Sequence, residues 1–287
     1  MLFMYVSAFW IYQKAYEPRT FVLLLIGILC YLLTMILLNH LMKKFELTSS
    51  NTLTIILFAF LSALFPYSLL DIYMIIANLL LLTAVNFLIS MSNNRSIKGK
   101  ILNASMCVAL ASLSYSWCIV MMLLVYLAIW YFDRKEYRNW LIPLVGLGAI
   151  AILSICFHLI VYNEWRVFSL NVLSYSLKNL QFQFSVKEMF GFGCFILCSL
   201  FFIAVYIYKF KKRLTRLKPI FNVFMWYYVV SFVIILFFSE YKSAGILLAV
   251  TPLSVIGTSY LESIQNKLVS EITLWAFLIL PFFTFFL

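Results

Sequence analysis

Long apolar runs recur along the whole chain and constrain its fold more than any other feature of the sequence. An α-helix needs about 20 apolar residues to cross the hydrocarbon core of a membrane, and runs of this kind follow one another from end to end. Of the 287 residues, 65% are hydrophobic and 11% are charged, which excludes soluble enzymes and secreted disulfide scaffolds. No alternating β-barrel pattern is present. The sequence therefore predicts an all-α, polytopic transmembrane helical bundle.

The bundle is predicted to be one integral membrane domain over residues 1–287, with about 10 or 11 hydrophobic segments. The segments cover residues 1–12, 21–42, 52–69, 71–91, 101–114, 115–132, 139–162, 189–208, 219–239, 243–260 and 268–287. Segment 1–12 is too short to cross a membrane alone, so it is either a truncated span or an interfacial piece. It lacks a basic n-region and a cleavage site, so we do not expect a cleavable signal peptide.

The placement of lysine and arginine predicts the topology. If the stretch 101–132 crosses twice, with a break near residues 112–116, one side of the membrane holds 15 of the 21 basic residues. A single crossing gives 9 against 12. The positive-inside rule favours the double crossing, although the stripe Ser105, Ala109, Ser112 and Ser116 has the spacing of one unbroken helix and is typical of close helix packing.

The double crossing places the N-terminus in the cytoplasm and the C-terminus outside, in a bacterial inner membrane. The loops predicted to be cytoplasmic are 43–51, 92–100, 133–138, 209–218 and 261–267. Loop 163–188 lies on the outer face and is the longest polar connection. Its apolar residues recur at helical spacing, which predicts an amphipathic helix in the outer interface. These residues are Leu170, Leu173, Leu177, Leu180 and Phe184.

The placement of charges and cysteines limits which partners and cofactors we expect. The net charge of +11 sits in loops between apolar runs, which indicates membrane topology rather than nucleic-acid binding. We expect membrane lipid as a partner, with other membrane proteins as a further possibility. Cys194 and Cys198 share a helix face, but neither histidine is near them in sequence, so we expect no metal and no cofactor.

A set of charged residues is predicted to collect on the outer face at helix ends. A carboxylate base beside a cation that holds phosphate is what a transferase of polyprenyl-phosphate-linked sugars needs. Solvated helix ends of a non-catalytic protein would look the same, so the sequence leaves open whether the chain is an enzyme. The candidate residues are Glu17, Arg19, Asp71, Glu164, Arg166, Glu240 and Lys242.

Several stretches resemble a family of polytopic inner-membrane proteins from Bacteroidota whose activity is uncharacterised. The stretches are 43–52, 101–105, 110–115, 137–146, 251–254 and 266–271. Relative to that family, the short first segment suggests that this chain begins later. Members are sometimes labelled beta-carotene monooxygenase, but such an iron oxygenase needs several histidines and only His40 and His158 exist here. The resemblance implies no functional residues.

Three functions are consistent with these features. The first is a protein of cell-envelope biogenesis that handles lipid-linked glycans. The second is a non-catalytic subunit of a membrane complex, and the third is a lipid or glycolipid translocator with a polar central cavity. A shared outward pocket of charged residues next to a lateral opening would favour the first function.

Overall fold

The structure, a computed structural model, describes residues 18–47, 52–65, 68–69, 71–93, 96–134, 136–162, 186–210, 217–238, 242–262 and 275. Side chains are described for these residues except 18–24, 162, 186–190, 208–210, 237–238 and 242–244. The described residues form helices and no strand, which confirms the all-α prediction. The α-helices are α2 (Pro18–Lys44), α3 (Leu53–Ala63), α5 (Ile72–Ser90), α6 (Ile97–Ser114), α7 (Met122–Phe132), α8 (Ile142–Tyr162), α10 (Val186–Phe210), α11 (Lys218–Phe238) and α12 (Lys242–Glu262). Short 3₁₀ helices are η1 (Met91–Asn93), η2 (Ser116–Met121) and η3 (Tyr137–Trp140).

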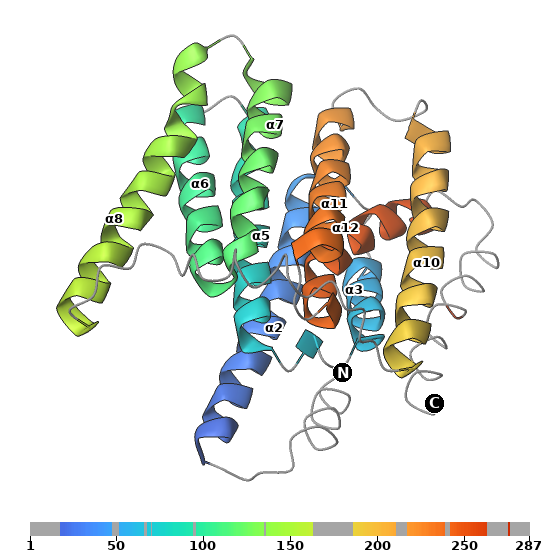
Figure 1. The fold of residues 1–287 in the computed structure, drawn as a ribbon. Helices are drawn as coiled ribbons and strands as arrows, with labels where there is room; N and C mark the ends of the chain where they lie inside the picture. Colours follow the sequence, from blue (N-terminus) through green and yellow to red (C-terminus); the bar gives the residue numbers. More distant parts are fainter. Residues whose placement is uncertain are drawn as a thin grey trace.

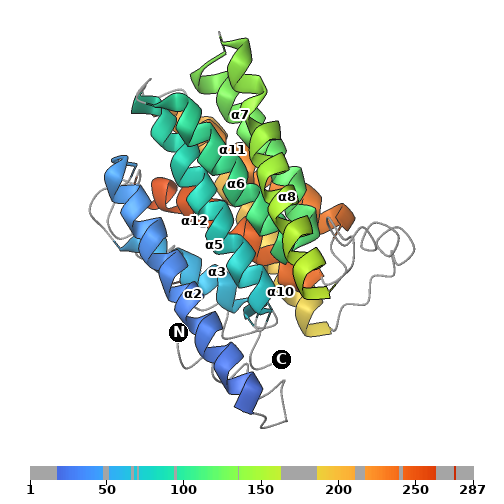
Figure 2. The ribbon, with the colours of Figure 1, turned by 90° about the vertical axis from the view of Figure 1, so that its left-hand side faces the viewer.

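The helices form two layers (Figures 1 and 2). In one layer α2, α5, α6 and α8 pack side by side in that order. In the other layer α12 packs against α3, α10 and α11, and α7 packs against α11. Contacts of α12 with α5 join the layers. In the most apolar part of α12, 83% of the residues are buried, whereas the corresponding value for the stretch that contains α8 is 17%. The central helix is therefore α12, and α8 lies at the edge.

Five stretches of the described chain are long and apolar enough to cross a membrane. They are Leu25–Lys44, Ile72–Asn93, Tyr137–Val161, Lys218–Leu236 and Gly245–Glu262. Three shorter apolar helices accompany them: Leu53–Ala63, Ser116–Phe132 and Gly191–Ile207. The composition of the described helices therefore fits a multi-pass membrane protein.

The central helix α12 contains a proline, and a side chain of a neighbouring helix compensates in part for the backbone hydrogen bond that this proline removes. Pro252 has no N–H, so it cannot donate to the carbonyl of Leu248, one turn earlier. The hydroxyl of Ser231 in α11 lies 3.2 Å from that carbonyl and 2.8 Å from the carbonyl of Tyr227 in its own helix, so it shares its one hydrogen between the two acceptors. These residues all lie in the buried core, where an unpartnered carbonyl is destabilising. The hydrogen bond therefore ties α11 to the point where α12 lacks its own backbone bond.

A buried polar contact also joins the two layers. The hydroxyl of Thr251 in α12 donates to Oδ1 of Asn78 in α5 at 2.7 Å. Both residues are almost completely buried. Because a hydrogen bond in an apolar interior is directional, this contact fixes the register of α12 against α5.

The stretch 101–132 is divided into two helices at Tyr115. This residue is extended (φ −140°, ψ 106°), and it separates α6 from η2 and α7. Nζ of Lys98, in the first turn of α6, lies 3.3 Å from Oε2 of Glu136, just after α7. The two helices therefore run in opposite directions, as the predicted double crossing requires. The crossing itself stays a prediction.

Small residues bring α6 and α8 close together. A Cβ atom added to Gly146 of α8 would lie 2.9 Å from Cβ of Ser105 in α6, so only glycine fits there without a shift of the helices. Ser105, Ala109 and Ser112 of the stripe noted in the sequence are all buried. At Ser105 the stripe serves close helix packing, which is the structural role suggested by its spacing.

The helix in the predicted segment 52–69 is shorter than that segment. α3 has 11 residues and rises about 16 Å, well short of the ~30 Å hydrocarbon core. Pro66 explains the early end, because proline disfavours helical backbone at the residue before it. The predicted segments 1–12 and 268–287 and the interfacial helix in 163–188 lie outside the described residues, apart from the start of α10 and residue 275.

Candidate functional site

Sequence-distant basic segments meet at one end of the bundle, which we call the basic end. It comprises the described residues of 43–46, 92–100, 131–138 and 217–220, at the upper end of Figure 1, where α7 ends and α11 begins. Residues from the ends of α2, η1 and α7 and the start of α11 line a common hollow. This arrangement places the C-termini of α2 and α5 at the same end of the molecule.

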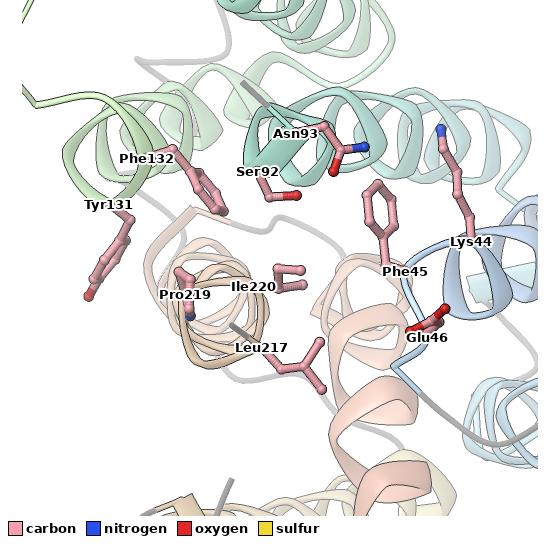
Figure 3. Close-up of a pocket in the computed structure, with 10 residues that line it drawn as sticks. All are labelled: Lys44, Phe45, Glu46, Ser92, Asn93, Tyr131, Phe132, Leu217, Pro219 and Ile220. Atoms are coloured by element: carbon pink, nitrogen blue, oxygen red, sulfur yellow. The ribbon is translucent and has the colours of Figure 1, made fainter. Parts of the chain in front are cut away.

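The first hollow at the basic end, the Leu217 hollow, has a volume of about 380 Å³. Figure 3 shows Phe45, Phe132 and Ile220 around it, with Ser92 and Asn93 on one side. It is lined by Lys44, Phe45, Glu46, Ser92, Asn93, Tyr131, Phe132, Leu217, Pro219 and Ile220. Its mixed lining combines one acidic and one basic side chain with aromatic rings.

The end of α2 has a Schellman geometry that positions Lys44 and Glu46. Glu46 has a positive φ of 52°. Its N–H donates to the carbonyl of Lys43 at 3.2 Å, and the N–H of Leu47 donates to that of Met42 at 3.1 Å. These two bonds satisfy terminal carbonyls of the helix. Lys43 and Lys44 lie in the last turn, where the helix dipole favours cations.

The second hollow, the Lys100 hollow, adjoins the first and shares Lys44 and Asn93 with it. Its volume is about 430 Å³. It lies between the C-terminal parts of α2 and α5 and the N-terminal part of α6. It is lined by Lys44, Asn86, Phe87, Ser90, Asn93, Ser96, Gly99, Lys100 and Asn103. Two ammonium groups and three amides thus surround this hollow, and no carboxylate is among its described lining residues.

The two lysines of the Lys100 hollow repel each other. Burial lowers the pKa of Lys100, and the positive charge of Lys44 lowers it further. Nζ of Lys100 donates to the carbonyl of Ser90 at 2.6 Å. An ammonium group has three N–H donors, so this bond leaves two of them for another acceptor. The amide oxygen of Asn86 is buried without a hydrogen-bond partner among the described residues.

Aromatic side chains pack with a cation beside the loop between α7 and α8. The guanidinium of Arg134 lies 4.0 Å from the ring centroid of Trp130. The rings of Trp130 and Trp140 meet edge to face at 6.3 Å, and Tyr126 stacks on Trp140 at 6.1 Å. Tryptophan and tyrosine are enriched where a membrane protein meets the headgroup region.

The structure describes only part of the predicted outer-face set. Asp71 is the N-cap of α5, and its Oδ1 accepts hydrogen bonds from the N–H groups of Tyr73 (3.0 Å) and Met74 (3.4 Å). Arg19 and Lys242 lie in the first turns of α2 and α12, with only their backbone described. Glu17, Glu164, Arg166 and Glu240 lie outside the described residues. The shared outward pocket therefore stays a prediction, and Asp71 has a structural role.

The residues of the Lys100 hollow were not among those predicted from the sequence, although their spacing carries a signal. Asn86, Ser90 and Asn93 follow i, i+4, i+7 spacing along the end of α5 and into η1. The same spacing relates the polar residues of α6, namely Ser96, Lys100 and Asn103. Polar residues at this spacing share one face of a helix. Two such faces in consecutive segments indicate a polar contact between the helices. Among the described residues, no three His, Cys, Asp or Glu side chains are grouped as metal ligands.

Comparison with known families matches residues 1–287 to DUF6427, a family of unknown function. The chain therefore belongs to DUF6427. Comparisons with curated proteins and with solved structures found no match. The family match agrees with the resemblance to an uncharacterised family. An origin in Bacteroidota and an inner-membrane location stay predictions.

Proposed function

We propose that this DUF6427 protein is a multi-pass protein of the bacterial inner membrane that binds membrane lipid at its basic end, which faces the cytoplasm. The observation that carries the proposal is the set of five long apolar helices in the described chain. Their outward faces are apolar as well: Ile152, Leu153 and Phe157 of α8 are each about 60% exposed. Such a continuous apolar face is costly in water and is suited to contact with lipid chains.

The distribution of charge supports the proposed orientation. The basic residues whose side chains are described all lie at the basic end: Lys43, Lys44, Lys98, Lys100, Arg134, Arg138 and Lys218. Arg19, Lys187 and Lys242, of which only the backbone is described, lie in the first turns of α2, α10 and α12. Cytoplasmic loops of membrane proteins carry an excess of Lys and Arg. The aromatic cluster around Trp130 lies beside the same loops, at the depth where headgroups would contact it.

A narrower function in cell-envelope biogenesis, with a polyprenyl-phosphate-linked glycan as substrate, would need a carboxylate base beside a phosphate-binding cation. Oδ1 of Asp71 accepts hydrogen bonds from two backbone N–H groups and caps α5, so the described contacts of this residue lend that function no support. The basic end lends support to phosphate binding. Binding of a lipid headgroup is therefore the part of the hypothesis that we retain, while the subunit and translocator alternatives stay open.

Cysteine labelling of opposite ends tests the proposal. Tyr73, at the start of α5, and Tyr137, in η3, are 65% and 73% exposed. In a variant without the six native cysteines, Tyr73→Cys should react with a membrane-impermeant maleimide in intact spheroplasts. Tyr137→Cys should react only after the membrane is disrupted. Reaction of Tyr137→Cys in intact spheroplasts would reverse the orientation, and release of the protein from membranes by alkaline carbonate would refute the membrane location.

A further inference from the structure

We propose that the Lys100 hollow binds a phosphate group carried by the headgroup of an anionic membrane lipid. This inference rests on the proposed function, because a lipid is the expected source of the phosphate only if the chain lies in a membrane. Phosphate recognition by the hollow itself rests on the geometry of α2, α5 and α6.

The charge of the hollow favours an anion. Lys44 and Lys100 both line it, and their mutual repulsion is not offset by a carboxylate among the described lining residues. The ion pair recorded in the described chain, between Lys98 and Glu136, lies outside the hollow. A bound phosphate between the two ammonium groups would replace repulsion by two charge-assisted hydrogen bonds.

The neutral lining supplies further donors. Three amides and the hydroxyl of Ser96 surround the lysines, whereas the hydroxyl of Ser90 donates to the carbonyl of Phe87 at 2.7 Å. The amides are those of Asn86, Asn93 and Asn103. A phosphate has several acceptor oxygens, so it can use more donors than the lysines alone provide. The unpartnered amide oxygen of Asn86 accepts hydrogen bonds, and a headgroup with a hydroxyl or ammonium group could satisfy it. A phosphate ester with such a substituent therefore fits the lining better than a bare anion.

The start of α6 adds a favourable dipole to the lysines and amides. Ser96, the N-cap, has a positive φ of 48° and its side chain makes no capping hydrogen bond. The first turn contains no acidic residue. The N–H groups of a first helical turn have no partner within the helix and attract anions. Ser96 and Gly99, which line the hollow, come from this turn.

The size and place of the hollow fit a headgroup. Its volume of about 430 Å³ is within the usual range of small-molecule sites. Gly99 borders open space, since a Cβ added there meets no atom within 4 Å. Phe87 is the large apolar residue of the lining. The hollow adjoins the end of Ile72–Asn93, a candidate span, so an occupant would lie at headgroup depth.

Ligand binding to the purified full chain in detergent tests the inference. The probes are short-chain phosphatidylglycerol, short-chain phosphatidylcholine and inorganic phosphate, each titrated by calorimetry. We expect phosphatidylglycerol to bind most tightly, and Lys44→Gln or Lys100→Gln to weaken it about tenfold each. Lys98→Gln is the matched control, because this lysine lies on the same turn of α6 but outside the hollow, and it should bind like the native chain.

A steric variant separates loss of binding from loss of folding. Gly99→Leu should block the hollow while preserving all its charges and the helix, and it should abolish the same binding. If inorganic phosphate binds as tightly as phosphatidylglycerol and with the same dependence on Lys44 and Lys100, the phosphate site stands and free phosphate is its source. If no probe binds, or if Lys98→Gln weakens binding as much as the other two changes, the inference is overturned. The titration with inorganic phosphate needs no membrane, so it tests the phosphate site even if cysteine labelling refutes the membrane location.

Discussion

Two glycines on α8 provide a stringent test of the packing described above, because they differ only in what they face. A Cβ added to Gly146 would lie 2.9 Å from Cβ of Ser105 and closer still to its Oγ. A Cβ added to Gly148 meets no atom within 4 Å. We therefore compare Gly146→Ala with Gly148→Ala, two identical changes two residues apart on one helix.

The magnitude follows from two opposing contributions. Alanine stabilises a helix interior over glycine by about 1 kcal/mol, and this gain applies to both positions. Overpacking of a tight contact costs about 1–3 kcal/mol, and this cost applies to Gly146 alone. Rotation of the Ser105 hydroxyl, which donates to the carbonyl of Leu102 at 2.7 Å, would leave the two Cβ atoms in collision. Gly148→Ala should therefore be neutral or stabilising, and Gly146→Ala should be less stable than it by about 1–3 kcal/mol.

Unfolding of the two variants in mixed detergent micelles, followed by tryptophan fluorescence, measures this difference. Ser105→Gly removes the two nearest atoms that the new Cβ would meet. Measured against the Ser105→Gly single variant, Gly146→Ala should therefore no longer destabilise the protein. Equal stabilities of Gly146→Ala and Gly148→Ala would show that α6 and α8 are not in the close contact described.

Two further changes probe hydrogen bonds in the same assay. Ser231→Ala should cost about 1–3 kcal/mol because the carbonyl of Leu248 loses the donor that it shares with the carbonyl of Tyr227. The cost should shrink in a Pro252→Ala background, which restores an N–H for Leu248. It should be smaller for the control Ser254→Ala, because the bond of that hydroxyl to Thr251 lies within one helix and compensates for no proline. A Ser231→Ala cost that Pro252→Ala does not change would argue against this pairing. Asp71→Ala should cost about 1 kcal/mol by removing the N-cap of α5, whereas Asp71→Asn should retain the cap. Full stability of Asp71→Ala would contradict the capping role.

Apolar runs and charge placement predicted the helical class and several element boundaries. The runs 71–91, 139–162 and 219–239 correspond closely to α5, α8 and α11, because their length and hydrophobicity are local properties. The break at Tyr115 falls within the stretch 112–116 chosen from the balance of basic loops. The helix α3 is shorter than the run 52–69, since hydrophobicity alone does not register the effect of Pro66 on backbone geometry.

The site was harder to predict because it depends on which helices are neighbours. The sequence contains the polar spacing of Asn86 and Asn93 in one apolar segment and of Lys100 in the next, but it does not show the approach of Lys44 from α2. That approach results from packing of α2 against α5, which no local pattern encodes. Conversely, Asp71 was selected for its charge, and its capping role depends on the exact residue at which α5 begins.

The attachment of α8 at one edge has a consequence for how the molecule opens. This helix packs mainly on α6, whereas α12 is enclosed on several sides. In a protein with such unequal enclosure, the cooperative units of partial unfolding differ in free energy, and the edge element opens at the lowest cost. α8 can therefore separate from the bundle while α5, α11 and α12 keep their contacts. An apolar substitution on the outward face of α8 changes the free energy of its attached and detached states equally, so this face tolerates sequence change as long as it remains apolar. Gly146, which contacts α6, does not tolerate such change.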